Sequence, residues 1–315
     1  MLDEIYHALD PIAFQIGPFA VRWYGIGYIL GIALGMLVVY RTAKRWGVKL
    51  TIESVLTVTI AAAIGIIFGA RIGSILFYNL EYHLAHPLDM FTFANGGMSF
   101  HGGLIGMVLA VIIAARLIKL PTLTLGDLIV IGAPIGIFLV RIANFINGEL
   151  WGAVTDVPWG VVFETGGSLP RHPSQLYEAL LEGAVLFAVL FVLSRRKPPF
   201  SRGSYLGVFM LLYGVFRIAV EFVRQPDANI GYLLGTNWLT MGMVLSTPMI
   251  LVGIGFLVYA FRTRLPQAQP NAGEPTGADK PTGAGQPTGA KQPTDADKPT
   301  GANEPTDADK PTDAE

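Results

Sequence analysis

Long apolar runs alternate with short polar segments along most of this chain. A helix of roughly 20 predominantly apolar residues crosses the hydrocarbon core of a bilayer, which is about 30 Å thick, so each run is a candidate membrane span. The runs cover about residues 21–40, 53–78, 102–118, 125–146, 176–193, 204–223 and 238–261. The pattern predicts an all-α integral membrane protein with seven transmembrane helices.

Lysine and arginine are concentrated in every second segment between the runs. The segments after the first, third, fifth and seventh runs contain Arg41, Lys44, Arg45, Lys49, Arg116, Lys119, Arg195, Arg196, Lys197, Arg202, Arg262 and Arg264. The alternate segments contain few basic residues, and none lies between Tyr78 and His101. Because cytoplasmic loops are enriched in basic residues, we expect the N-terminus outside and the C-terminus in the cytoplasm. The first 20 residues contain no lysine or arginine, which argues against a cleavable signal peptide.

The composition of the chain changes near residue 265. From there, six-residue units rich in proline, threonine, glycine and aspartate repeat to the end, beginning with Pro-Thr-Gly-Ala-Asp-Lys. A segment of this kind cannot bury an apolar core. We therefore expect residues 1–264 to form the membrane domain and residues 265–315 to form a disordered cytoplasmic tail.

The overall composition narrows the possible functions. Charged residues make up 14% of the chain, well below the roughly 25% of soluble domains, and the net charge of −1 offers no basic surface for nucleic acid. The chain has no cysteine, so it has no disulfide and no thiol nucleophile of its own. No cluster of histidines or carboxylates calls for a metal, and we expect neither a metal nor a cofactor.

In this topology, the unusual polar residues of six runs and their flanks gather toward the outer side of the membrane. They are Tyr24, Arg71, His101, Arg141, Asn144, Asn147, Glu149, His172, Gln175, Tyr213, Arg217, Glu221 and Arg224. A charge at the bilayer centre costs roughly 2.5–3.5 kcal/mol and is rarely kept without a use. Their common depth therefore predicts a functional site on the outer side.

Helical spacing places the arginines of two runs on single faces. One face carries Tyr213, Arg217, Glu221 and Arg224, which are spaced i, i+4, i+8, i+11. The other carries Arg141, Asn144 and Gly148, which are spaced i, i+3, i+7. Arginine presents a planar fork of donors that pairs with phosphate and stays charged. The two faces predict an anion site, and the abundant anion at this depth is a phospholipid headgroup.

Several of these residues also have a structural interpretation. Arg217 and Glu221 could form an intrahelical ion pair, and Arg71 is better explained by snorkelling to the interface. His101 could be a hydrogen-bonded histidine inside the bundle, although its place between glycine pairs favours a functional role.

Two further features of the fourth run are better explained by structure. Gly132 and Gly136 form a small-xxx-small pair, which indicates helix packing. Asp127, near the start of this run, is interpreted as a helix cap.

Two other classes of function remain open. A transporter for an anionic solute would carry its site near the midplane, often in repeated halves, whereas these polar residues lie toward one side and the runs show no internal repeat. An intramembrane protease could use Ser99 with His101, but their i, i+2 spacing on a helix directs them to different faces.

Four polar motifs in order along the chain identify a resemblance. They are Gly97–Gly103 (Gly-Met-Ser-Phe-His-Gly-Gly), Arg141–Gly152, Arg171–Glu178 (Arg-His-Pro-Ser-Gln-Leu-Tyr-Glu) and Arg224–Asp227. Together they resemble the prolipoprotein diacylglyceryl transferase family over about residues 15–262, and that family also has seven spans with the N-terminus outside. One position departs from the family pattern: the residue before Arg141 is usually glycine, and here it is Val140.

The resemblance implies an enzyme of the bacterial cytoplasmic (inner) membrane, with its active site toward the outer leaflet. It implies transfer of the diacylglyceryl group of phosphatidylglycerol to the lipobox cysteine thiol in the signal peptide of a prolipoprotein. The products are a thioether and glycerol phosphate. Membrane lipids and these signal peptides are the expected partners, and the outer loop 150–173 is the expected cap over the site.

The resemblance also implies roles for individual residues. Arg141 and Arg217 are expected to bind the phosphate and stabilise its developing charge. A free cysteine thiol has a pKa near 8.5, so a base is needed, and family analogy makes His101 the leading candidate, with Glu149 as its rival. Tyr24, counted with His101, Arg141 and Arg217 as a catalytic residue, and Tyr213 are expected to position the headgroup or relay a proton. The other residues expected to bind the headgroup or orient the arginines are Asn144, Glu149, Glu221 and Arg224.

Overall fold

The structure is a computed structural model that describes residues 1–78, 80–91, 98–226 and 231–267. Among these residues, six helices are long and apolar enough to cross a membrane. They are α2 (Trp23–Trp46), Ile52–Leu76 within α3 (Ile52–Tyr78), α6 (Thr122–Ile146), the helix Ser174–Ser194, α9 (Ser204–Glu221) and α10 (Met241–Thr263). The third predicted span corresponds to α5 (Phe100–Leu117), which is apolar but shorter. The prediction of a mostly helical, multi-pass membrane protein is confirmed.

The helix Ser174–Ser194 consists of three successive stretches, with a π-helix between two α-helical ones. It begins as α7 (Ser174–Glu178), continues as the π-helix η2 (Ala179–Val185) and ends as α8 (Leu186–Ser194). π-helical turns are rare and occur frequently at functional sites. The irregular stretch begins directly after Glu178 and contains Glu182.

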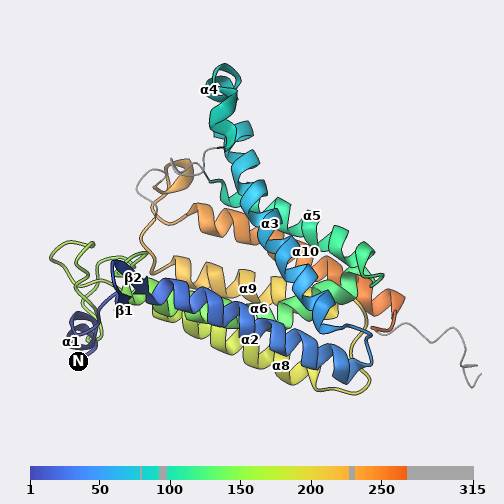
Figure 1. Cartoon of the computed structure of the whole chain (residues 1–315). Coiled ribbons are helices and arrows are strands. Elements are labelled where there is room, and N and C mark those ends of the chain that lie inside the picture. The colour runs from blue at the N-terminus through green and yellow to red at the C-terminus, as the bar shows by residue number, and fades with distance from the viewer. Residues whose placement is uncertain (79, 92–97, 227–230, 268–315) are drawn as a thin grey trace, which may run out of the picture. The chain divides into compact units, whose positions relative to one another are not determined.

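The long helices pack as three close pairs, α2 with α6, α9 with α10 and α3 with α5. Figure 1 shows α2, α6, α8 and α9 running along one another, with α10 beside α9. Helix α6 also contacts η2, α8, α9 and α5, so it joins the pairs. The largest buried cluster lies among α2, α6, α8 and α9 and includes Trp46, Leu128, Ile131, Leu186 and Tyr205.

Glycines bring the paired helices into backbone contact. A Cβ atom at Gly31 of α2 would lie 2.8 Å from the Cα of Gly136, and one at Gly73 of α3 would lie 2.6 Å from the Cα of Gly102. Gly132 likewise faces Gly35. Small residues let helices approach closely in lipid, so the interpretation of Gly132 and Gly136 as packing residues is confirmed.

Asp127 caps a helix, but the helix is not its own. Asp127 lies in α6, and its side chain is fully buried. The carboxylate accepts hydrogen bonds from the backbone N–H groups of Gly203 (2.7 Å) and Leu206 (2.8 Å). Gly203 is the N-cap residue of α9, so a carboxylate from one helix satisfies the free donors of another. Gln267 donates to the same carboxylate over 2.6 Å.

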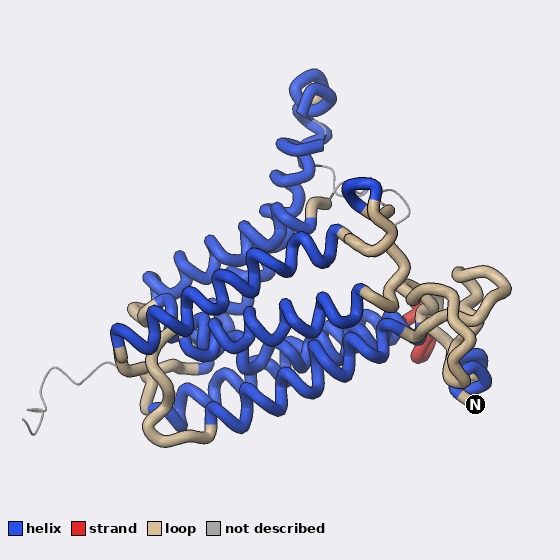
Figure 2. The backbone as a smooth tube through the Cα atoms, turned by 180° about the vertical axis from the view of Figure 1, so that it is seen from behind, coloured by secondary structure: helices blue, strands red, loops and turns tan. Residues whose placement is uncertain are grey.

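A small region lies beyond one end of the bundle, where Figure 2 shows the strands and the N-terminus beside a long loop. It contains α1 (Leu2–His7) and a hairpin of β1 (Ile12–Ile16) with β2 (Phe19–Arg22), which the sequence did not predict. In α1, Tyr6 packs its ring against Phe145 and Phe163, which joins α1 to α6 and to the loop 150–173.

A second protruding segment follows α3, and its backbone contacts the side chain of Arg71 in α3. This segment contains α4 (Leu80–Ala85) and η1 (Pro87–Phe91). Another short helix, η3 (Leu233–Gly235), lies elsewhere in the chain and precedes α10. The buried side chain of Arg71 donates to the backbone oxygens of Asp89 and Met90. The snorkelling interpretation was therefore wrong, because Arg71 instead fixes the end of η1.

Candidate active site

The end of α6 turns the chain back on itself. Gly148 has φ +68°, and the N–H groups of Gly148 and Glu149 bond to the carbonyl oxygens of Phe145 and Asn144. This is a Schellman ending, in which glycine takes the left-handed conformation. Gly148 therefore terminates the helix instead of extending the face of Arg141. The reversal lets Asn144 donate to Glu149 Oε1 over 2.8 Å.

Glu178 connects the arginines of two helices. Its buried carboxylate lies 2.6 Å from Nε of Arg141 on α6 and 3.4 Å from Nη1 of Arg217 on α9. Glu182, one turn further along η2, approaches Nη1 of Arg217 to 4.0 Å. The two predicted arginine faces therefore do meet, and a shared carboxylate holds them together.

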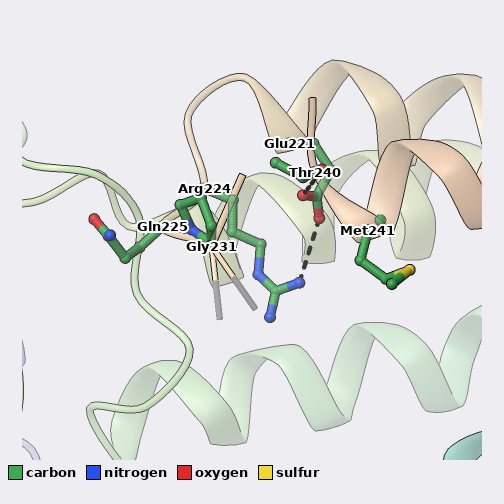
Figure 3. A pocket seen from close by; sticks show the side chains of 8 residues that line it. Glu221, Arg224, Gln225, Gly231, Thr240 and Met241 are labelled. Carbon is green, nitrogen blue, oxygen red and sulfur yellow. Dashed lines mark hydrogen bonds and ion pairs between the residues drawn. The ribbon is translucent and has the colours of Figure 1, made fainter. Parts of the chain in front are cut away.

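Glu221 extends the network to α10. Its carboxylate lies 2.5 Å from Nη2 of Arg217 and accepts hydrogen bonds from Nη1 of Arg224 at 3.3 Å and from the hydroxyl of Thr240, the N-cap residue of α10, at 2.6 Å. Figure 3 shows the last two contacts and the small pocket beside them, which is also lined by Met241. The ion pair Arg217–Glu221 exists, but it is one link in a larger chain of charges.

The two tyrosines lie beside this network. Tyr24 is partly buried at the start of α2, close enough to interact electrostatically with Glu149 and Arg141. Tyr213 lies within electrostatic range of Arg141 and Arg217. These residues therefore belong to the same region as the arginines.

His101 lies at the start of α5, a helix that carries none of the arginines of the network. Its side chain is exposed at the start of α5, and this helix packs mainly on α3. The contact between α5 and α6 is made at the other end of α5, where Ala114 and Ala115 meet Leu125. The described contacts bring together Arg141, Asn144, Glu149, Arg217, Glu221 and Arg224.

Two carboxylates at the centre of the network were not among the predicted site residues. Glu178 and Glu182 are both fully buried, although Glu178 is part of a motif that was recognised. Acidic residues one turn apart inside an apolar run were the available signal. Gln175, one turn before Glu178, donates to the backbone oxygen of Glu149 over 2.6 Å and joins α7 to the end of α6.

The loop 150–173 is folded back onto the ends of the helices. Arg171 stacks over the ring of Trp151 at 3.9 Å, and the N–H of Gly152 bonds to the carbonyl oxygen of His172. Tyr177 accepts a hydrogen bond from the indole of Trp159 at 2.6 Å and lies 3.2 Å from Nδ1 of His172. Partial burial lowers the pKa of the His172 imidazole, which favours the neutral ring.

Gly183→Ala should weaken the network without removing a charge. A Cβ atom there would lie 2.7 Å from the Cβ of Phe138 and 2.8 Å from its Cα, so η2 must move away from α6 and carry Glu178 away from Arg141. Overpacking of this kind costs about 1–3 kcal/mol. We expect a lower midpoint of thermal unfolding and slower turnover. Gly255→Ala in α10 is the control, because a Cβ atom at Gly255 meets no atom of the described residues within 4 Å. Equal losses in the two variants would contradict this explanation.

Comparison with known proteins relates the chain to one family. The family model described as "Prolipoprotein diacylglyceryl transferase" matches residues 11–259. A relative from Mesorhizobium japonicum is 50% identical over 273 residues, which are 84% of this chain and 94% of the relative. Relatives from Geobacter sulfurreducens (49% over 257 residues; 82% and 97%) and Brucella canis (51% over 259 residues; 79% and 91%) are similar to the same extent. All three are named phosphatidylglycerol–prolipoprotein diacylglyceryl transferase.

Proposed function

The chain belongs to the prolipoprotein diacylglyceryl transferase family, and on this premise we propose that Arg141 and Arg217 bind the phosphate of its lipid substrate. The protein is a transferase that moves the diacylglyceryl group of phosphatidylglycerol to prolipoproteins, the first step of lipoprotein maturation. The predicted resemblance is thereby confirmed. An enzyme with this activity must hold a phosphodiester and bring the acceptor group of a second substrate to its glycerol carbon.

The proposed chemistry is a displacement at carbon. The sulfur of the prolipoprotein's lipobox cysteine attacks the terminal glycerol carbon of the diacylglyceryl group, the bond between this carbon and the phosphate oxygen breaks, and glycerol phosphate leaves. The thiol proton passes to a base, for which the candidates are His101, Glu149 and a tyrosine, Tyr24 or Tyr213. Arg141 and Arg217 stabilise the negative charge that develops on the departing phosphate, as preorganised donors do. Asn144, Glu149, Tyr24 and Tyr213 position the headgroup or the arginines.

The proposed membrane geometry has seven spans, with α5 as the third. The N-terminus is outside, the C-terminus is cytoplasmic and the network faces the outer leaflet of the bacterial cytoplasmic membrane. Residues 1–264 form the membrane domain, the loop 150–173 caps the site, and residues 265–315 form the tail. The supporting observation is the alternation of basic residues between successive helices.

The contact that carries this proposal is the bridge from Arg141 through Glu178 to Arg217. Two arginines from different helices are held within reach of one anion, which is the arrangement that a phosphate requires. The direct experiment is incubation with phosphatidylglycerol and a lipobox peptide, followed by mass spectrometry. We expect the peptide to gain one diacylglyceryl group, and a peptide with serine in place of the cysteine to gain none.

A pH profile tests His101 as the base. If His101 accepts the thiol proton, the wild-type rate should rise with pH, because a general base must be deprotonated before it can act. His101→Gln should be slower and should lose this rise. An unchanged profile would remove His101 from consideration and favour Glu149, which the described contacts place beside Asn144.

A further inference from the structure

A second basic cavity lies far from the arginine–glutamate network. It has a volume of about 320 Å³ and is formed between α2 and α8, near the end of α2 opposite Tyr24. Its lining residues are Leu37, Val38, Arg41, Thr42, Arg45, Phe187, Phe191, Ser194 and Arg195. At 1.5 Å per residue, Tyr24 and Arg45 are separated by about 30 Å along α2. The cavity is therefore not part of the site already described.

The two walls of this cavity repeat one pattern. Each wall has apolar residues followed by arginine at the spacing i, i+4, i+8, with Leu37, Arg41 and Arg45 on α2 and Phe187, Phe191 and Arg195 on and just after α8. Residues at this spacing share a helical face. The apolar part therefore lies toward the middle of the helices, and the cationic part lies at their ends.

The helix ends that form the cavity are tied together directly. Nη2 of Arg45 donates to the backbone oxygen of Arg195 over 2.8 Å, and the indole N–H of Trp46 donates to the backbone oxygen of Ser194 over 3.0 Å. These bonds place the two arginine-bearing ends side by side. The cavity is thus a built feature of the fold and not a loose gap between helices.

The polar groups of the cavity call for an anion. Nε of Arg45 is buried and has no hydrogen-bond partner among the described residues, which is costly for a charged group. The side chains of Arg41 and Arg195 are exposed, and the residues that line the cavity include no acidic side chain. A phosphate could accept hydrogen bonds from all three guanidinium groups.

The apolar wall calls for a hydrocarbon chain. The rings of Phe187 and Phe191 are stacked, with centroids 5.4 Å apart, and Leu37 on the opposite wall is 41% exposed. An apolar surface that continues directly into a cluster of arginines matches the two parts of a phospholipid. Soluble phosphate would use only the arginines and would leave the apolar wall uncovered.

We propose that this cavity binds an anionic phospholipid, with its phosphate against Arg41, Arg45 and Arg195 and an acyl chain along Phe187 and Phe191. The lipid is not consumed, because the arginines proposed to act on the phosphate lie near the other end of the helices. With the proposed orientation, it belongs to the cytoplasmic leaflet. Its role is to hold the ends of α2 and α8 together, as basic pockets between spans do when they bind acidic lipids.

The test compares two variants of the full-length protein that lose the same charge. Arg41→Gln with Arg195→Gln removes two cations from the cavity and keeps the bond from Arg45. Arg262→Gln with Arg264→Gln removes two exposed cations near the end of α10, outside the cavity. Each protein is placed in phosphatidylcholine nanodiscs with or without phosphatidylglycerol, and bound lipid and the midpoint of thermal unfolding are measured.

We expect phosphatidylglycerol to raise the midpoint of the wild-type protein and of the Arg262/Arg264 variant. The Arg41/Arg195 variant should lose most of this rise and bind the lipid about 25-fold more weakly, since each of the two basic residues contributes about a factor of five to binding of an anionic lipid. Equal rises in all three proteins would overturn the proposal. An equal rise with inorganic phosphate alone would also overturn it, because a lipid would then not be needed.

The same samples keep this inference separate from the proposed catalytic roles. Diacylglyceryl transfer to a lipobox peptide is measured in parallel and reports on Arg141 and Arg217. The Arg41/Arg195 variant should still transfer at saturating phosphatidylglycerol. Loss of the lipid-dependent rise in midpoint with transfer retained is the expected combination, and retention of the rise in this variant contradicts the inference whatever the transfer rate.

Discussion

Arg141→Ala and Arg217→Ala should each abolish diacylglyceryl transfer, with losses in turnover of at least about 100-fold. Removal of one preorganised donor from a developing anion typically has this effect, and here each donor is a charged guanidinium that is largely buried. Lysine at either position should restore only part of the rate, because it keeps the charge but lacks the planar pair of N–H groups. Mass spectrometry of a lipobox peptide measures the outcome.

The two variants differ in how safely they can be interpreted. Arg217 has three carboxylates within 4.0 Å, and breaking a buried pair commonly costs about 3–5 kcal/mol. Arg141 is 20% exposed and should be the cleaner test. Thermal unfolding must accompany both, with Arg116→Ala, an exposed arginine near the end of α5, as the control. Near-normal turnover in a folded Arg141→Ala protein would contradict its role in phosphate binding.

Glu178→Gln should bind the headgroup more tightly and turn over more slowly. The network contains three arginines and three buried glutamates, Glu178, Glu182 and Glu221. The glutamates therefore already neutralise the positive charge of the arginines before a phosphodiester binds. Glutamine keeps an oxygen for Nε of Arg141 but removes the charge that competes with phosphate. Unit charges 4 Å apart interact by about 4 kcal/mol in a partly polar environment, so a tenfold gain in affinity is a conservative expectation.

Glu178→Ala should have the opposite effect on affinity. Alanine removes the competing charge together with the contact that holds the two arginines near each other, so glycerol phosphate should bind more weakly than in the wild-type protein. Inhibition of transfer by glycerol phosphate measures both affinities, and Glu53→Gln, an exposed position at the start of α3, is the charge-matched control. Weaker inhibition in both Glu178 variants would mean that Glu178 only supports the structure.

The apolar runs predicted the helices well because the bilayer restricts what a spanning segment can be. Without water to bond exposed backbone groups, a long apolar run must be helical, and α6 begins and ends close to the predicted residues 125–146. The same physics made the polar residues conspicuous, so the arginine-bearing helices could be recognised. Six of the predicted site residues, including Arg141 and Arg217, do lie in one connected network or at its ends.

Contacts between helices could not be obtained from spacing within one helix. The period of 3.6 residues shows that Glu178 and Glu182 share a face, but not that this face meets Arg141 and Arg217. Asp127 illustrates the same limit, since it caps α9 and not its own helix. The hairpin of β1 and β2 was missed because it is short and partly exposed, and its formation depends on pairing of two segments around Gly17.

The seam between α3 and α5 has a genetic consequence. At Gly69 and Gly73, the atoms that a larger side chain would meet include backbone atoms of Gly102 and Gly106. A harmful substitution in a core is often rescued by trimming the neighbouring side chain, but here the nearest neighbours, Gly102 and Gly106, have no side chain to trim. Revertants of a Gly69 or Gly73 mutant should therefore be dominated by true reversion to glycine, and second-site suppressors should be rare along this seam.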